Sequence, residues 1–113
     1  RIGIVEGDPA RRLKLAGLLR AHCAAAVPLP DERAALALLA EGALDGLLVD
    51  AAACDPATLA ALRESPVPTI LLVAADSAQS SGGAVTVLAK PVTGAQVLGA
   101  LRGLFTQHLA EAA

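Results

Sequence analysis

The sequence is almost without aromatic side chains: Phe105 is the only one among 113 residues, and there is no Trp or Tyr. Nucleic-acid modules that stack bases need exposed aromatic rings, and one ring cannot form such a platform. Basic charge is scarce as well, since the net charge is −2 and the isoelectric point is near 5.6. Binding to a phosphate backbone depends on an excess of Lys and Arg. We therefore expect no nucleic-acid partner for this domain.

Long apolar runs are also absent, although the mean hydropathy is +0.59. The clearest apolar run, residues 66–75, falls well short of the roughly 18 residues that a membrane-spanning helix needs. No signal peptide is visible at the N-terminus, which begins with Arg1 rather than Met. We expect a cytoplasmic domain that makes no membrane contact and is excised from a larger protein.

Cysteine and histidine are too sparse for a metal or disulfide framework. Cys23 and Cys54 lie far apart in the sequence, and apart from the adjacent His22 no other Cys or His lies at the spacing of zinc ligands. We therefore expect both cysteines to behave as small apolar residues. His22 and His108 each lie near the end of an expected helix, where a cationic side chain suits the helix dipole. We interpret both histidines as structural.

Short apolar segments alternate with segments of helical periodicity along the chain. Strands are expected at residues 2–5, 24–27, 44–49, 69–73 and 85–88, the second closed off by Pro28 and Pro30. Helices are expected at residues 9–21, 32–41, 56–63 and 94–109, with Asp8, Asp31, Asp55 and Thr93 as N-terminal caps and Gly42 as a stop. Residues 75–83 lack apolar periodicity and contain two glycines, so at most one helical turn fits there.

The first helix is expected to be amphipathic. Its leucines recur at roughly helical spacing and predict a buried face, formed by Leu13, Leu15, Leu18 and Leu19. Its cationic residues are left for the solvent side, namely Arg11, Arg12, Lys14 and Arg20. The cluster of Arg11, Arg12 and Lys14 is interpreted as an ordinary solvated helix face.

The alternation predicts one α/β domain over residues 1–113: a doubly wound, five-stranded parallel sheet of the flavodoxin-like type, with the fourth helix shortened or missing. In such sheets, ligands and chemistry collect at the carboxyl ends of the strands. Glu6, Asp50, Ala74 and Lys90 each follow a predicted strand. The pattern therefore indicates two acids and a lysine that converge at one edge of the sheet.

Three segments carry a family resemblance: VEGDP at 5–9, LLVD at 47–50 and AKP at 89–91. Together, and in this order, they resemble the bacterial response-regulator receiver domain, the phosphoacceptor module of two-component signalling. The resemblance implies that Asp50 accepts a phosphoryl group from a histidine kinase or a histidine phosphotransfer domain, and that Lys90 contacts the phosphoryl oxygens. It also implies a receiver-type fold, a bound Mg²⁺ ion and contacts with neighbouring domains of a parent protein.

The expected metal site departs from the family pattern. Receivers have two adjacent acids after the first strand, and the second position is Gly7, which has no side-chain oxygen. Mg²⁺ commonly uses one or two carboxylates plus phosphate oxygens, so Glu6, Asp50 and the backbone carbonyl of Ala52 would form a weaker site. Asp8 could replace the missing acid, but its place before a proline favours the helix-cap role.

The switch residues of the family are missing too. The Thr or Ser after the fourth strand is replaced by Ala74, which cannot donate a hydrogen bond to a phosphoryl oxygen. The aromatic residue of the fifth strand is replaced by Val87, whose branched side chain has little rotamer freedom. The segment before the fifth strand is too short for a full fourth helix. We therefore expect partner contacts on the first or the last helix instead.

Two hypotheses follow. In the first, the domain still accepts phosphate at Asp50 as one station of a phosphorelay, in a hybrid sensor histidine kinase or a response regulator. In the second, it is a pseudo-receiver that docks proteins or binds a small ligand independently of phosphate, and Asp50 and Lys90 form a relic ion pair. No enzymatic activity of its own is expected beyond phosphoacceptance, since the sequence has no second nucleophile–base pair and no glycine-rich phosphate loop.

Overall fold

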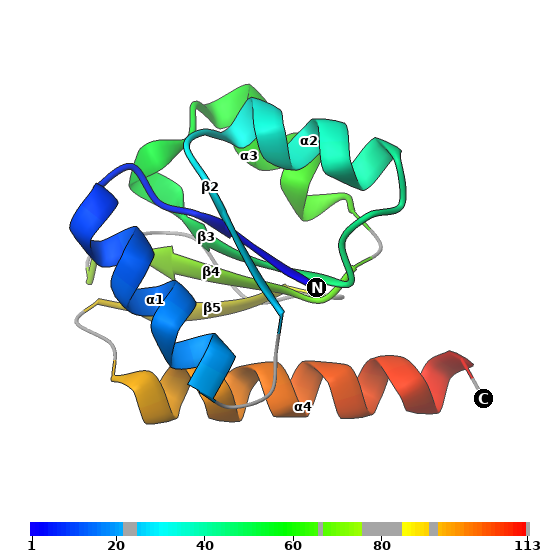
Figure 1. The fold of residues 1–113 in the computed structure, drawn as a ribbon. Helices are drawn as coiled ribbons and strands as arrows, with labels where there is room; N and C mark the ends of the chain where they lie inside the picture. Colours follow the sequence, from blue (N-terminus) through cyan, green and yellow to red (C-terminus); the bar gives the residue numbers. More distant parts are fainter. Residues whose placement is uncertain (22–24, 66, 76–84, 91–92, 113) are drawn as a thin grey trace.

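The computed structural model describes residues 1–21, 25–65, 67–75, 85–90 and 93–112. For residues 53 and 104–112 it describes the backbone and not the side chains. Five parallel strands form one sheet in the order β2-β1-β3-β4-β5 (Figure 1). The strands are β1 (Ile2–Val5), β2 (Ala26–Leu29), β3 (Gly46–Asp50), β4 (Thr69–Val73) and β5 (Val85–Ala89). The helices are α1 (Pro9–Ala21), α2 (Glu32–Ala40), α3 (Pro56–Arg63) and α4 (Gly94–Ala112), and a short 3₁₀ turn, η1 (Ala51–Ala53), follows β3. This architecture confirms the predicted five-stranded parallel sheet.

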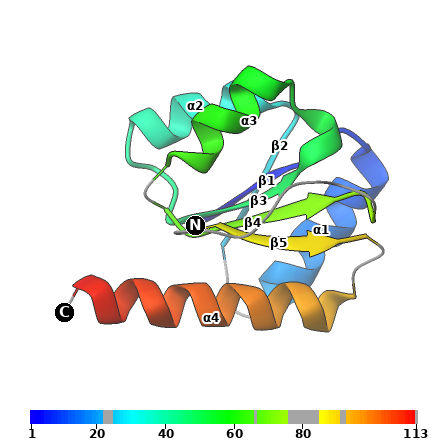
Figure 2. The same cartoon turned by 180° about the vertical axis from the view of Figure 1, so that it is seen from behind.

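Helices cover both faces of the sheet, as Figures 1 and 2 show from opposite sides. Side chains of α1 and α4 pack on one face around Ile4, Leu48 and Ile70. Side chains of α2 and α3 pack on the other face around Leu47 and Leu71. Because the central strands are buried on both faces, polar side chains are placed where the strands end. The helix expected to be shortened or missing, with at most one turn at residues 75–83, falls almost entirely on residues 76–84, which lie outside the described residues.

Short polar caps start the helices at the predicted positions. The side chains of Asp8, Asp31 and Asp55 accept hydrogen bonds from backbone N–H groups in the first turns of α1, α2 and α3. Thr93 and Gln96 form a reciprocal capping box at the start of α4, with N···O distances of 2.7 and 3.1 Å. These bonds satisfy backbone donors that have no partner within the helix.

The second strand differs from the prediction. It covers Ala26–Leu29 rather than residues 24–27, so Pro28 lies inside the strand and does not close it off. Pro28 pairs with Ile4 of β1, and β1 is the only neighbour of β2 among the described strands. An edge strand tolerates proline because one of its sides needs no ladder hydrogen bonds.

Smaller shifts occur at other element ends. β3 begins at Gly46 rather than at residue 44 and includes Asp50. Leu44 is buried, but it precedes the residues that pair with β1. β5 extends one residue beyond the prediction and α4 three residues beyond it. Pairing with the neighbouring strand sets the ends of β3 and β5, and hydrophobic periodicity does not report this pairing.

One leucine of α1 was wrongly expected to face the core. Leu13 is 67% exposed, whereas Ala16 and Leu19 are fully buried. Leu13 lies roughly 120° around the helix from Leu19, outside the buried stripe. Ala16 and Leu19 fill the buried face of α1, and a pattern of leucines alone did not indicate the alanine.

A glycine in β1 allows three leucines to meet above the sheet. A Cβ atom at Gly3 would lie 2.8 Å from Leu44, 3.2 Å from Leu47 and 3.3 Å from Leu29. These contacts are tighter than van der Waals packing accepts, and the leucines around them are buried. The position therefore needs a residue without a side chain.

We predict that Gly3→Ala lowers the free energy of unfolding by about 1–3 kcal/mol, because the core is overpacked. Gly17→Ala is the matched control: Gly17 lies on α1 with nothing within 4 Å of the added Cβ, so the change should stabilise the protein by up to about 1 kcal/mol. Urea denaturation of both variants measures the two effects. Equal behaviour of the two variants would contradict this account of Gly3.

Candidate functional site

The carboxyl ends of three strands bring Glu6, Asp50 and Lys90 to one edge of the sheet. Val5 pairs with Val49, so the residues that follow them lie at adjacent strand ends. Asp50 pairs with β4, and Lys90 follows the residue of β5 that pairs with the end of β4. The backbone N–H of Lys90 also donates to the carbonyl of Val73 at 2.8 Å. The strand order thus places the three predicted residues together.

Asp50 and Lys90 form a short ion pair. The Nζ atom of Lys90 lies 2.6 Å from Oδ1 of Asp50. The side chain of Asp50 is only 6% exposed and that of Lys90 is 29% exposed, so the carboxylate is the buried partner. The same Oδ1 atom accepts a hydrogen bond from the backbone N–H of Ala52 at 3.1 Å. In the described part of the chain, no group donates a hydrogen bond to Oδ2, the second oxygen of Asp50.

Glu6 is held by the loop that follows β1. It is buried, and its Oε1 atom accepts a hydrogen bond from the backbone N–H of Asp8 at 3.0 Å. Gly7 is exposed between them and contributes no side chain. Asp8 itself caps α1 through Oδ1, and its Oδ2 pairs with Arg11 at 3.2 Å. These bonds confirm the cap role of Asp8 and leave Glu6 as the acid that this loop places at the strand end.

Arg12 has a role that the sequence did not indicate. It was expected on the solvent side of α1, but it is partly buried. Its guanidinium donates to the backbone carbonyls of Glu6 and Leu29, both at 3.3 Å. Arg12 therefore ties α1 to the carboxyl ends of β1 and β2. Only the folded sheet brings these carbonyls together, so spacing along the chain gives no signal for it.

The donor set fits a weak magnesium site and not a closed metal cage. Among the described residues, no three Asp, Glu, His or Cys side chains gather to hold a metal ion. Glu6 and Asp50 nevertheless lie at the ends of adjacent strands. Mg²⁺ usually takes one or two carboxylates and keeps several waters. Ala52, whose backbone carbonyl was the third expected ligand, lies in η1, directly after Asp50.

The two replaced switch positions lack the chemistry of a relay. Ala74 is exposed just after β4 and borders a hollow of about 440 Å³, also lined by Ala51, Ala52 and Arg63. Val87 is half-buried on β5 and packs against the core beneath α2 and α3. There is therefore a hollow beside Ala51 and Ala52, but no hydroxyl at position 74 and no ring at position 87.

Cys54 lies four residues after Asp50 and is half-buried. Burial, and then the negative charges of Glu32, Asp50 and Asp55, raise the pKa of its thiol to about 11. The thiol therefore stays protonated at neutral pH and does not act as a nucleophile. Cys23 and His22 lie outside the described residues, as does the side chain of His108.

We predict that Lys90→Ala lowers the free energy of unfolding by about 2–3 kcal/mol, because a buried carboxylate is left unpaired. Adding Asp50→Asn to Lys90→Ala should recover about 1 kcal/mol by removing that charge. Lys14→Ala is the control, since Lys14 is exposed and its removal should change stability by less than about 0.5 kcal/mol. A double variant no more stable than Lys90→Ala would argue against a buried, charged Asp50.

We predict slow alkylation of Cys54 in a Cys23→Ser variant. The thiol pKa of about 11 lies above the ordinary value of a cysteine, so the native protein holds less thiolate at pH 8 than the unfolded chain. Iodoacetamide should therefore react at least about tenfold more slowly with native protein than with protein unfolded in urea. The native rate should rise steeply above pH 9. Equal rates at pH 8 would contradict the raised pKa.

None of the helices in the described part of the chain has the length and hydropathy of a membrane span. No protein-family model matches the sequence, and no curated protein matches it either.

Solved structures similar to this chain include receiver domains, and the similarity covers nearly the whole length of this chain. The N-terminal domain of a response regulator/sensory box/GGDEF protein from Carboxydothermus hydrogenoformans has a TM-score of 0.79 at 19% identity, covering 99% of this chain and 98% of that one. A response regulator receiver domain protein from Methanospirillum hungatei has a TM-score of 0.82 at 19% identity, over 98% and 97% of the two chains. The receiver domain of the hybrid histidine kinase CckA has a TM-score of 0.72 at 25% identity, over 92% and 97%. The chain therefore has the fold of the response-regulator receiver domains.

Proposed function

We propose that this chain is a receiver domain of a two-component or phosphorelay system and that Asp50 is its phosphoacceptor. The observation that carries the proposal is the buried Asp50–Lys90 pair, with Nζ 2.6 Å from Oδ1, at the edge of the sheet where Glu6 also ends a strand. The phosphoryl donor would be a histidine kinase or a histidine phosphotransfer domain, and the domain would be one part of a larger signalling protein.

Asp50 is suited to in-line attack because its two oxygens have different surroundings. Oδ1 is held by Lys90 and by the N–H of Ala52, whereas Oδ2 accepts no hydrogen bond from the described residues. Oδ2 would form the new P–O bond while the P–N bond to the donor histidine breaks, and the imidazole leaves with that electron pair. Mg²⁺, when bound, would neutralise charge on the phosphoryl oxygens.

The ammonium of Lys90 would stay close to the negative charge of the site during phosphoryl transfer. In the resting domain its ammonium neutralises the buried carboxylate. Once Asp50 is phosphorylated, the negative charge lies on the phosphoryl oxygens, and the partly exposed, flexible lysine can reorient toward them. Glu6 and Asp50 would hold the metal with water and the backbone carbonyl of Ala52. With Gly7 in place of a second acid, we expect weak metal binding.

A second candidate function rests on the replaced switch positions. Ala74 cannot hydrogen-bond a phosphoryl group, and the branched Val87 cannot swing as a ring does. A domain of this kind could act as a pseudo-receiver that docks neighbouring domains or binds a ligand without phosphate. Under the main proposal, the same replacements describe a relay station that passes phosphate on without switching an output surface.

Labelling with acetyl phosphate and Mg²⁺ tests the proposal. We expect one acid-labile phosphoryl group per wild-type chain by mass spectrometry and none in Asp50→Asn, which lacks the nucleophilic oxygen. Asp45→Asn is the matched control: Asp45 is exposed just before β3, at the opposite end of that strand, and labelling should be unchanged. Gly7→Asp should tighten Mg²⁺ binding about tenfold by adding a carboxylate.

Two results would contradict the main proposal. If the wild type takes up no phosphate, and beryllofluoride with Mg²⁺ leaves the amide resonances of Glu6, Asp50 and Lys90 unchanged, the domain is a pseudo-receiver. Labelling that persists in Asp50→Asn would place the acceptor at another residue.

A further inference from the structure

A second cavity lies between α1 and the start of α4, next to the edge that holds Asp50 and Lys90. Its volume is about 630 Å³, within the range of small-molecule sites. Four apolar side chains form its floor: Leu15, Leu18, Leu72 and Val97. Thr93 and Gly94 border it at the start of α4. We call this cavity the α1–α4 groove.

Gly94 keeps the groove open where the two helices approach each other. A Cβ atom at position 94 would lie 3.0 and 3.1 Å from the two terminal carbons of Leu18. Any side chain here would press on Leu18 and narrow the space above the apolar floor. The hollow therefore depends on a glycine in the first turn of α4, which is not needed for the helix itself.

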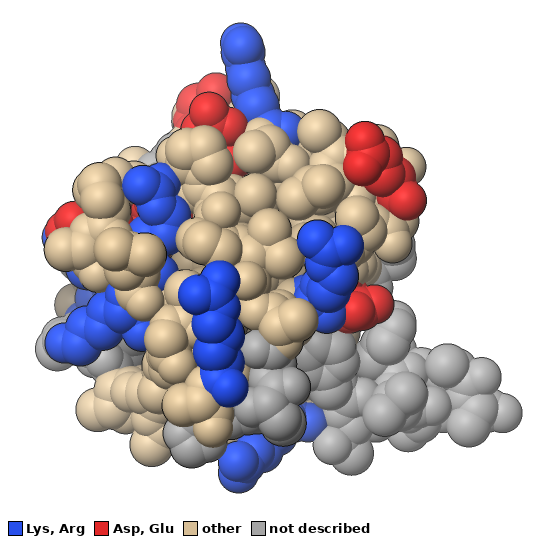
Figure 3. Space-filling view, in the orientation of Figure 1, with Lys and Arg blue, Asp and Glu red and all other residues tan. Residues whose placement is uncertain are grey.

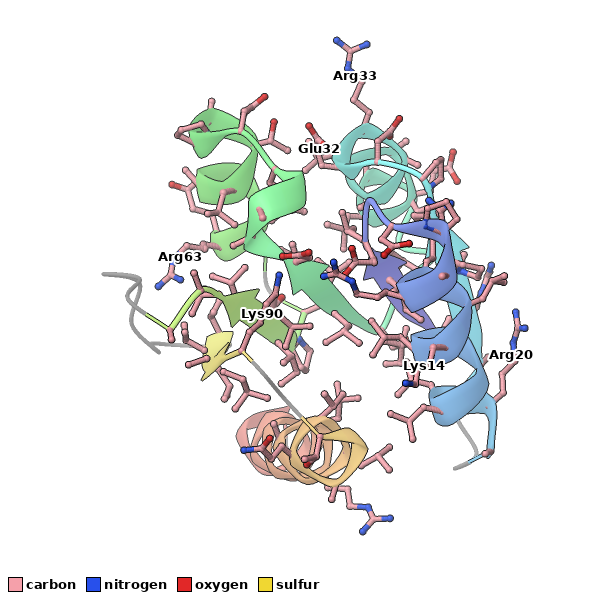
Figure 4. All side chains as sticks on the ribbon, turned by 90° about the vertical axis from the view of Figure 1, so that its left-hand side faces the viewer. Lys14, Arg20, Glu32, Arg33, Arg63 and Lys90 are labelled. Atoms are coloured by element: carbon pink, nitrogen blue, oxygen red, sulfur yellow. The ribbon has the colours of Figure 1, made fainter. Side chains whose placement is uncertain are left out.

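Cationic side chains border the groove, and one of them forms no ion pair with the described residues. Arg11 pairs with Asp8, and Lys90 pairs with Asp50. The ammonium of Lys14 forms no ion pair with the described residues. In Figure 4, Lys14 extends from α1 toward the space above α4, whereas Arg20 points to the outer side of the same helix. Figure 3 shows that cationic side chains also project over the region of α1.

Glu6 is the carboxylate among the lining residues, and it is turned toward the loop backbone through its bond to the N–H of Asp8. The lining carries Arg11, Lys14 and Lys90 against this one acid, so it favours a negatively charged group. An apolar floor with a cation at its border is complementary to a molecule with an aliphatic body and an anionic head.

We propose that the α1–α4 groove binds a small aliphatic anion, with its hydrocarbon part on the leucine floor and its anionic head at Lys14. A head that also reaches Lys90 competes with Asp50 for the ammonium, so the ligand would act on the same ion pair as a phosphoryl group. The site itself requires neither Mg²⁺ nor phosphorylation, although it shares Lys90 with the proposed phosphoacceptor site.

Amide NMR titration with octanoate tests the proposal, in the absence of Mg²⁺ and phosphodonor. We expect saturable shifts at Leu15, Leu18, Gly94 and Val97 with a Kd of about 5 mM or tighter. Binding should weaken by roughly twofold to fourfold for each methylene removed, from octanoate through hexanoate to butyrate. The neutral analogue 1-hexanol should bind several-fold more weakly than hexanoate.

Variants separate the groove from general surface charge. Lys14→Ala should weaken octanoate binding about threefold to fivefold. Arg33→Ala is the matched control, because Arg33 is an exposed cation on α2 that points away from the groove (Figure 4), and it should leave binding unchanged. Asp50→Asn should retain binding, so loss of phosphate labelling and loss of groove binding are distinguishable.

Three results would overturn the proposal. Octanoate shifts that do not saturate, or that spread over the surface, would show that the groove is not a site. Equal affinity for hexanoate and 1-hexanol would show that the anionic head is not recognised. An equal loss in Lys14→Ala and Arg33→Ala would show that the effect is nonspecific screening.

Discussion

The ion pair between Asp50 and Lys90 is the interaction on which the candidate site depends. A carboxylate that is 6% exposed needs a partner, because an unpaired charge at this depth costs several kcal/mol. The partner comes from 40 residues away in the sequence and from a strand that is not adjacent to β3. The pair can therefore form only after β4 has docked between β3 and β5. The site is a consequence of sheet assembly rather than of any local segment.

The family resemblance implies two tasks for this edge of the sheet, namely accepting a phosphoryl group and transmitting a switch. The residues at the edge differ in how well they suit the two tasks. Accepting a phosphoryl group needs a nucleophilic oxygen, a cation and a metal-binding acid, and Asp50, Lys90 and Glu6 have these chemistries. Transmitting a switch needs a hydroxyl and a mobile ring, and Ala74 and Val87 have neither. The first task depends on charge at the strand ends, whereas the second depends on side chains that move. This chain has the residue types for the first task and lacks those for the second at positions 74 and 87.

Helix α1 has side chains that contact the sheet edge, that border the α1–α4 groove and that are exposed to solvent. Arg12 donates to backbone carbonyls at the ends of β1 and β2 and so fixes the helix against the edge. Leu15 and Lys14 border the α1–α4 groove, and Leu13 is exposed to solvent. These side chains therefore give one helix contacts with the sheet edge, with the groove and with solvent.

Much of this protein could be predicted from the sequence alone. Polar residues that end buried apolar runs indicated Glu6, Asp50 and Lys90, and aspartates before prolines or helical segments indicated the caps of α1 and α3. These features are local, since a cap or a strand end depends on a few neighbouring residues. The tertiary structure decided the rest. Pro28 lies in β2, which is an edge strand among the described strands. Arg12 turns inward because carbonyls at two strand ends accept its hydrogen bonds. Leu13 is exposed because it lies outside the stripe of α1, with Ala16 and Leu19, that packs on the sheet. The α1–α4 groove belongs to this second group, because a hollow arises from how helices distant in sequence pack together, which residue order does not specify.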